Sequence, residues 1–198
     1  MPRATAAAAA LTADRILEAA TELFANRGFA EISLDDVARA AEVTRGAVYH
    51  HYRSKTGLFE AVVERLQSEV ADAVVAAAER AGDSPEDQLC AGSHAFLDAI
   101  TSGSAARTLL IDAPAVIGWQ EWRRLDVEHS AAHLRDALRD AGVSSDQLEA
   151  TTALLSGAMN ETAVWIMQQE DAGSARAQAH RALDGLLGAY VSVDPASS

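Results

Sequence analysis

The chain has 198 residues and is poor in the features that mark secreted, membrane and disulfide-rich proteins. Cys90 is its single cysteine, so we expect neither an internal disulfide nor a cysteine-based metal site, and a buried helix position suits it better than a redox role. No stretch longer than Ala150–Asn160 lacks a charged residue, against the ~18 apolar residues of a membrane span. The first residues also lack the apolar core of a signal peptide. These absences predict a cytoplasmic protein with no membrane contact.

Signatures of catalysis are missing as well. The sequence contains no G-x-S-x-G elbow, no P-loop and no H-E-x-x-H pair. Ser93 and His94 are adjacent, and neighbours on a helix do not face each other. We therefore expect no enzymatic activity, no cofactor and no resident metal.

Proline is scarce, strand-type alternation is absent, and apolar residues recur at helical spacing. Thr12, Ser33, Thr44, Ser54 and Ser84 are predicted helix N-caps. The expected fold class is all-α, with about nine helices over residues 12–28, 33–41, 44–52, 54–81, 84–101, 104–113, 118–142, 144–170 and 174–191.

Nearly all of the net negative charge comes from residues 61–198. The formal net charge is -13, yet residues 1–60 hold 7 basic and 8 acidic residues, while residues 61–198 hold 9 basic and 21 acidic residues. This asymmetry suggests two roles in one chain.

A basic and aromatic segment, VTRGAVYHHYRSK at residues 43–55, lies in the less acidic part. Two short helices joined by a tight turn, the second rich in Arg, Tyr and His, are typical of a helix-turn-helix, which lays its second helix in the major groove of DNA. Arg45 suits a base edge or a phosphate, and the other residues whose chemistry suits DNA are Ser33, Thr44, Gly46, Ala47, Tyr49, Tyr52 and Lys55. The alternative is a solvated basic face without a partner.

Residues 15–63 resemble the N-terminal domain of TetR-type transcriptional regulators. The resemblance covers about a quarter of the chain and rests on RILEAA..LF...G, S..D.A..A and V.RG..Y.HY.SK..L in that order. It implies that Thr44, Arg45, Tyr49, His50 and Lys55 contact DNA. Two positions depart from the usual pattern: Glu42 stands where the turn usually has Gly, and Tyr52 where Phe is usual.

The helix predicted over residues 144–170 is apolar nearly all round, so we expect it to be buried on one side in its own core and on the other in a second subunit. With the last helix it would form a four-helix dimer interface, as the resemblance also implies. The residues predicted for that interface are Leu154, Gly157, Ala158, Leu183, Leu186, Leu187 and Tyr190.

A pocket for a small-molecule effector is expected between the C-terminal helices. The candidate lining residues are His94, Phe96, Trp119, Trp122, Met159, Asn160 and Trp165, and core packing is the alternative for each aromatic residue. His129 and His133 share a helix face with Asp126, but no fourth ligand is evident, so a solvated face is preferred to a metal site there.

These patterns predict a ligand-responsive repressor that binds a palindromic DNA operator as a homodimer. Residues 11–57 would form the helix-turn-helix domain, and residues 58–194 the domain for effector binding and dimerisation. A small-molecule-binding or scaffold protein whose DNA binding is weak or lost is the alternative, because of Glu42 and the net negative charge.

Overall fold

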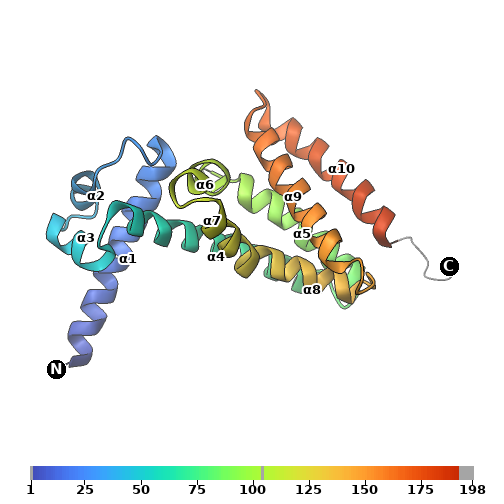
Figure 1. The fold of residues 1–198 in the computed structure, drawn as a ribbon, viewed down its shortest axis with the longest axis horizontal. Helices are drawn as coiled ribbons and strands as arrows, with labels where there is room; N and C mark the ends of the chain where they lie inside the picture. Colours follow the sequence, from blue (N-terminus) through green and yellow to red (C-terminus); the bar gives the residue numbers. More distant parts are fainter. Residues whose placement is uncertain (1, 104, 192–198) are drawn as a thin grey trace. The chain divides into compact units, whose positions relative to one another are not determined.

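The computed structural model describes residues 2–103 and 105–191, with side chains from residue 7 to residue 189 (Figure 1). Within these ranges every regular element is a helix and none is a strand, so the expected all-α fold is confirmed. Two π-helical segments run directly into α-helices, which leaves nine separate helical stretches in the described residues, as predicted. In the same ranges no helix combines the length and the apolar character needed to cross a membrane.

The chain packs as two compact units, residues 1–66 with 107–122 and residues 67–106 with 123–198. The first unit contains α1 (Pro2–Arg27), α2 (Leu34–Ala40), α3 (Arg45–Tyr52), the beginning of α4 (Lys55–Arg80), η1 (Arg107–Asp112), α6 (Ala113–Val116) and the beginning of α7 (Trp119–Asp126). The second unit contains the remainder of α4 and α7, with α5 (Pro85–Thr101), η2 (Val127–Ala131), α8 (Ala132–Asp140), α9 (Leu148–Met167) and α10 (Ala172–Val191). The functional division at residues 57 and 58 stays a prediction.

An apolar core holds α1, α2, α3 and the start of α4 together in the first unit. The rings of Phe24 and Phe59 meet edge to face with centroids 5.2 Å apart, and both side chains are fully buried. Val48 attaches α3 to this core and is also fully buried. Burying one such side chain is worth about 1.5–3 kcal/mol. The orientation of α3, and so the face that it turns to solvent, is fixed by these contacts.

In the second unit α5 packs against α8, α9 and α10, and α9 packs against α8 and α10. One side of α9 lies in the core of this unit, as expected, because Leu148, Leu155, Met159 and Ile166 are all buried. The opposite side of α9 is partly exposed in the single chain. This unit therefore has a core of its own and an uncovered helical face.

Most of the predicted caps are confirmed. The Ser33 hydroxyl accepts from the Asp36 backbone N–H at 3.2 Å, and the Asp36 carboxylate accepts from the Ser33 backbone N–H at 3.0 Å, so a capping box begins α2. Thr44 begins α3 by accepting from the backbone N–H of Ala47 at 3.2 Å.

Two local expectations are wrong. Thr12 does not begin a helix, because α1 starts at Pro2 and the Thr12 hydroxyl donates to the Ala8 carbonyl at 2.9 Å. The alanine run before Thr12 is a strong helix former and carries the helix through that position. The helix expected to end at residue 113 continues to Val116, and Pro114 lies close to the junction where π-helical η1 passes into α6.

Candidate nucleic-acid interface and effector cavity

The turn between α2 and α3 has a left-handed residue at its centre. Glu42 has φ 53°, so the position does require the conformation that glycine adopts most easily. Glu42 N–H bonds to the Arg39 carbonyl at 3.3 Å, and Val43 N–H bonds to the Ala38 carbonyl at 2.9 Å, which is the Schellman pattern. Arg15 reinforces the turn from α1, where its guanidinium donates to the Ala41 carbonyl at 2.6 Å and lies 3.5 Å from the Glu42 carboxylate.

The outward face of α3 carries most of the residues predicted to touch DNA. Thr44, Arg45, Gly46 and His50 are exposed, and Tyr49 keeps 61% of its surface accessible although its ring is large and apolar. Ala47 is half-buried beside them. Buried Val48 on the opposite side holds this face outward.

One acidic side chain reaches this face from α2. The Arg45 guanidinium donates to the Asp35 carboxylate at 2.9 Å, and both side chains are more than half exposed. An exposed ion pair of this kind is worth only ~0–1 kcal/mol. Exchange of Asp35 for a phosphate or a base edge therefore has a small energetic cost.

Tyr52, Lys55 and Ser33 are engaged within the unit. The Tyr52 hydroxyl donates to the Ala13 carbonyl at 2.9 Å, and its burial raises the pKa of the phenol, with a smaller contribution from nearby Asp14. The Lys55 ammonium lies 4.2 Å from the centre of the Phe29 ring and has a pKa lowered by burial. The Ser33 hydroxyl is used in the cap of α2, so all three polar groups already have a partner within the unit.

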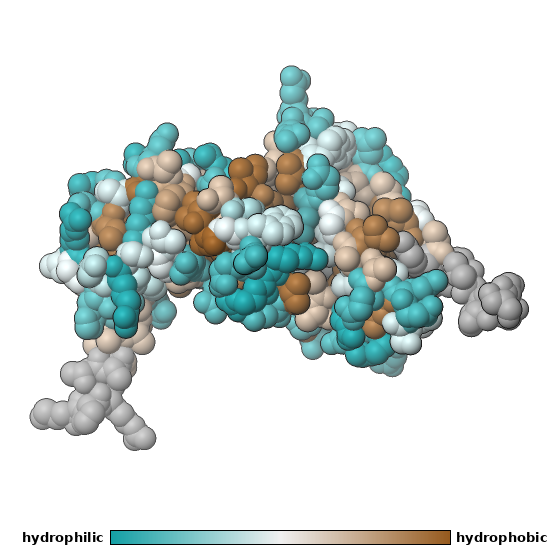
Figure 2. All heavy atoms as spheres, viewed as in Figure 1, coloured by the Kyte–Doolittle hydropathy of each residue, from teal (hydrophilic) through white to brown (hydrophobic). Residues whose placement is uncertain are grey.

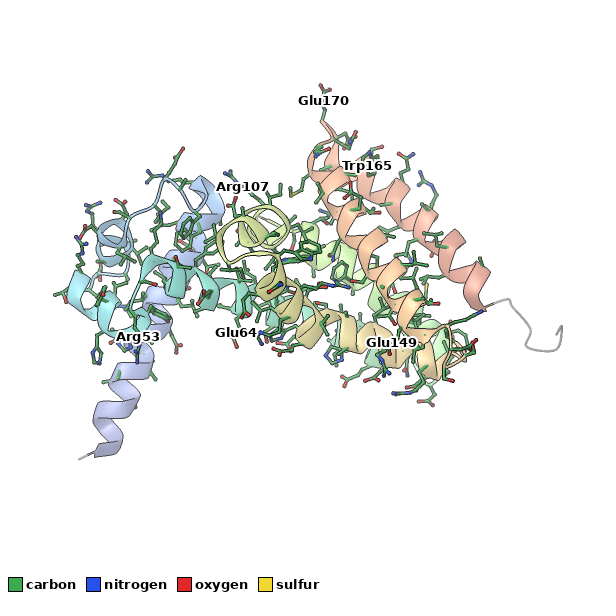
Figure 3. All side chains as sticks on the ribbon, in the orientation of Figure 1. Arg53, Glu64, Arg107, Glu149, Trp165 and Glu170 are labelled. Atoms are coloured by element: carbon green, nitrogen blue, oxygen red, sulfur yellow. The ribbon has the colours of Figure 1, made fainter. Side chains whose placement is uncertain are left out.

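Arg53 was missed by the sequence argument. It follows α3 directly, its side chain is exposed, and its φ of 64° turns the chain out of the helix (Figure 3). The signal that would have found it is its place in the segment 43–59, which contains no acidic residue.

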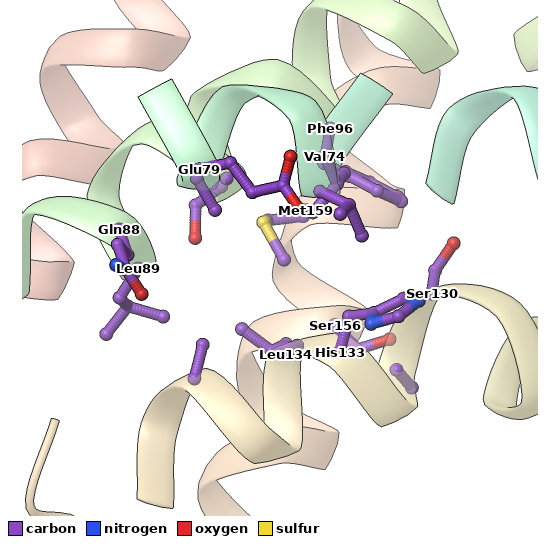
Figure 4. Close-up of a pocket in the computed structure, with 16 residues that line it drawn as sticks. Val74, Glu79, Gln88, Leu89, Phe96, Ser130, His133, Leu134, Ser156 and Met159 are labelled. Atoms are coloured by element: carbon purple, nitrogen blue, oxygen red, sulfur yellow. The ribbon is translucent and has the colours of Figure 1, made fainter. Parts of the chain in front are cut away.

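A cavity of about 190 Å³ lies within the second unit (Figure 4). Its wall comes from α4, α5, η2, α8 and α9, and Met159 lies among the labelled residues that surround it. The Ser93 hydroxyl is buried without a hydrogen-bond partner on this wall. The lining residues are Val74, Val75, Ala78, Glu79, Gln88, Leu89, Gly92, Ser93, Phe96, Ser130, Ala131, His133, Leu134, Ala137, Ser156 and Met159.

Phe96 and Met159 are the predicted effector residues that this cavity brings together. Trp119 and Trp122 belong to the first unit, where their rings lie 4.8 Å apart and Trp119 is 64% exposed. Trp165 is half-buried near the C-terminal end of α9 and is not part of the lining (Figure 3).

Two polar residues predicted for the effector pocket lie outside the cavity wall. Asn160 hydrogen-bonds the buried Asp126 carboxylate, whose pKa is raised by burial although Arg123 donates to it at 2.5 Å. His94 faces His180 on α10 instead.

The set of His129, His133 and Asp126 is not assembled as a metal site in the described residues. His133 borders the cavity, while Asp126 is bound by Arg123 and Asn160. Cys90 is half-buried on α5, and burial raises the pKa of its thiol, which disfavours a reactive thiolate.

Part of the predicted dimer interface forms an uncovered apolar face on α9 and α10. Leu154 is 64% exposed, Leu186 is 47% exposed, and a side chain added at Gly157 would meet nothing within 4 Å. Figure 2 shows a small hydrophobic patch over α9 and α10. Ala158 is half-buried, whereas Leu183 and Leu187 lie in the core of the unit itself. The remaining predicted residue, Tyr190, has a side chain outside the described part.

Comparison with known families gives two separate matches. Residues 16–62 match the model described as bacterial regulatory proteins, tetR family. Residues 86–190, more than half of the chain, match the model described as tetracyclin repressor-like, C-terminal domain.

Individual relatives agree with these matches. A TetR-family transcriptional regulator from Pectobacterium atrosepticum has a solved structure that is 33% identical, covers 96% of this chain and 98% of its own, and superposes with a TM-score of 0.74. The HTH-type transcriptional regulators SrpR and TtgR, both from Pseudomonas putida, are 46% identical over 67 residues and 42% identical over 66 residues. These two matches cover 34% and 33% of this chain and 32% and 31% of SrpR and TtgR, so they span about a third of the length of each relative.

Proposed function

The chain belongs to the TetR family of bacterial transcriptional regulators, and from this premise we propose that it is a ligand-responsive repressor that binds a palindromic operator as a homodimer. The observation that carries the proposal is the outward face of α3, where Arg45, Tyr49 and His50 are exposed together. No acidic residue interrupts the segment between Val43 and Phe59. Because the rest of the chain is strongly acidic, this face is the part that DNA phosphates would repel least.

The residues divide into two expected roles at the DNA. Arg45 and Tyr49 project from the first turns of α3 and would read base edges or phosphates in the major groove. Thr44 begins the helix, and the free N–H groups of its first turn suit a phosphate oxygen. Tyr52 and Lys55, which are held by Ala13 and Phe29, would contribute charge and shape to the backbone contact with little loss of side-chain freedom.

Operator binding is tested by selecting bound sequences from random DNA and then measuring single variants on the selected site. Arg45→Ala should weaken binding by about 1–3 kcal/mol and relax one base position if Arg45 reads a base, or lower the salt slope by about 1 if it contacts phosphate. Arg139→Ala is the matched control, because it removes one positive charge from an exposed position on α8.

The test has a clear negative outcome. If no sequence is enriched from random DNA at low salt, the chain is instead a binding protein without a DNA role. If Arg45→Ala binds the selected site as tightly as Arg139→Ala, α3 is not the helix in the groove.

Effector sensing is proposed for the cavity of the second unit. Its wall is mostly apolar, and Ser93 offers one buried hydroxyl that lacks a partner. The volume of about 190 Å³ is below the ~300–1,000 Å³ of drug-sized sites, so a small apolar molecule with one hydrogen-bonding group is the best match.

The link between cavity and DNA would be α4. This helix runs without a break from Lys55, which packs on Phe29, to Arg80, and its residues Val74 and Glu79 line the cavity. A ligand that favours one position of α4 would change the spacing of the two recognition helices in a dimer. A coupling of about 1–3 kcal/mol would alter operator affinity roughly 5–150-fold.

The homodimer would form through the uncovered face of α9 and α10. Exposed Leu154 and Leu186 with the open surface at Gly157 suit close packing of two identical helix pairs. Buried Leu183 and Leu187 would support α10 from behind that interface.

A further inference from the structure

A polar seam joins α5 and α10 away from the cavity wall. Cys90, His94 and Asp98 follow one another at intervals of four along α5, and His180 and Asp184 do so along α10. Side chains four apart lie on one face of a helix, so the two sets meet where the helices pack. None of the five lines the cavity.

The contacts within the seam form a connected chain. The His94 Nε2 lies 2.7 Å from Asp184 Oδ1, and the His180 Nε2 lies 2.9 Å from Asp98 Oδ1. The two rings stack with centroids 4.6 Å apart, and their Nδ1 atoms are in direct contact. The Cys90 thiol completes the group at 3.8 Å from Asp184 Oδ1.

The hydrogen bonds around the two rings are compatible with a cation at His94 Nε2. In that arrangement each ring carries one hydrogen: His94 Nδ1–H donates to His180 Nδ1, and His180 Nε2–H donates to Asp98.

We propose that Cys90, His94 and Asp184 bind a divalent transition metal, with Zn²⁺ as the best match. Their ligand atoms all lie within 4.8 Å of one another, and His94 Nε2 and Asp184 Oδ1, which are 2.7 Å apart, would separate slightly to admit an ion with bonds of about 2.0–2.3 Å. One thiolate, one imidazole and one carboxylate form a donor set that suits Zn²⁺ better than Mg²⁺ or Ca²⁺.

The surroundings of the three ligands fit such a site. His180 and Asp98 act as positioning residues, because they fix the ring and the tautomer of His94 in the way that metal-bound histidines are held. Asp184 keeps 57% of its side chain accessible, so the ion can enter and a fourth position remains open to water. The inference stands apart from the proposed DNA and effector roles.

The experiment uses the full chain, reduced and stripped of metal, and Co²⁺ as a spectroscopic probe for Zn²⁺. We expect one Co²⁺ per chain with a thiolate-to-cobalt charge-transfer absorption, and full displacement of Co²⁺ by one equivalent of Zn²⁺. Cys90→Ser should abolish the charge-transfer absorption. Asp98→Asn should keep that absorption but lower the affinity about 10–100-fold, as expected for a residue that only orients a ligand.

His129→Gln is the matched control, since it removes a histidine outside the seam and should bind Co²⁺ like the unmodified chain. Absence of stoichiometric Co²⁺ binding by the unmodified chain would overturn the proposal, whatever the variants do. It would also be overturned if Cys90→Ser, checked for helix content by circular dichroism, kept the full absorption. In both cases the seam is a hydrogen-bonded ladder that only joins α5 to α10.

Discussion

Replacement of Glu42 by glycine or by alanine separates backbone strain from charge in the turn of the helix-turn-helix. Glu42 is held at φ 53° by the Schellman bonds at the end of α2. A side chain in the left-handed region costs about 1–2 kcal/mol, and glycine avoids this cost but loses about 0.4–1 kcal/mol through greater freedom of the unfolded chain. Alanine keeps the strain.

Both substitutions remove the ion pair between Glu42 and Arg15, so its loss lowers the stability of the two variants equally. The two charged groups are 3.5 Å apart, and the side chains are 52% and 86% exposed, so the pair is worth at most ~0.5 kcal/mol. The hydrogen bond from Arg15 to the Ala41 carbonyl, at 2.6 Å, does not involve the Glu42 side chain and should persist. We therefore expect Glu42→Gly to be about 1 kcal/mol more stable than Glu42→Ala.

Thermal unfolding followed by circular dichroism measures this difference. For a chain of this size 1 kcal/mol corresponds to about 2–4 °C in Tm. Glu42→Ala should melt at or slightly below the Tm of the unmodified chain, and Glu42→Gly above the alanine variant. Equal Tm values for the two variants would show that the turn is not strained at Glu42, and a lower Tm for glycine would refute the reasoning. Both variants remove one negative charge beside α3, so both should bind the operator more tightly.

Three other predictions follow from the same structure. Gly157→Leu should leave the single chain folded, since a Cβ there meets nothing within 4 Å, but should yield monomers in sedimentation; an intact dimer would place the interface elsewhere. Asp36 has its pKa lowered from 3.8 to about 2 by the hydrogen bonds from Ser33, so its contribution to stability is complete above about pH 4 and is lost as the pH falls through 2. Asp36→Asn should therefore be less stable than the unmodified chain at pH 6, with the gap closing toward pH 2 in unfolding titrations; a constant gap would contradict this. For an effector found by thermal-shift screening, Met159→Ala should blunt release from the operator while Trp119→Ala should not, and the reverse pattern would move the effector site away from the cavity.

Local features of the chain were readable because their causes are local. The caps at Ser33 and Thr44 and the buried side of α9 each depend on residues a few positions apart, and all three are present. The wrong prediction of an N-cap at Thr12 also has a local cause. A residue caps a helix only where the residues before it are not helical, and the alanine run before Thr12 is helical.

The choice of effector residues could not be made from the sequence. An aromatic residue in the sequence is as compatible with packing in the core as with binding a ligand. Its spacing along a helix does not show which other helix it will contact. Trp119 and Trp122 pair with each other in the first unit, whereas the cavity forms where small residues such as Gly92, Ser93 and Ser156 leave space. The position of the cavity depends on which helices pack together, and helical periodicity in the sequence does not predict that packing.

By itself the sequence determined the helices, the short turn at Glu42 and the acid-free segment 43–59, because each follows from spacing and residue type within one segment. Tertiary structure alone decided the partners of long-range pairs. His94 and His180 are 86 positions apart, and Cys90 and Asp184 are 94 apart, so no spacing rule for metal ligands would join them. They meet because the apolar stripes of α5 and α10 are buried against each other, and burial of those stripes fixes which polar residues stand side by side at the edge of the contact.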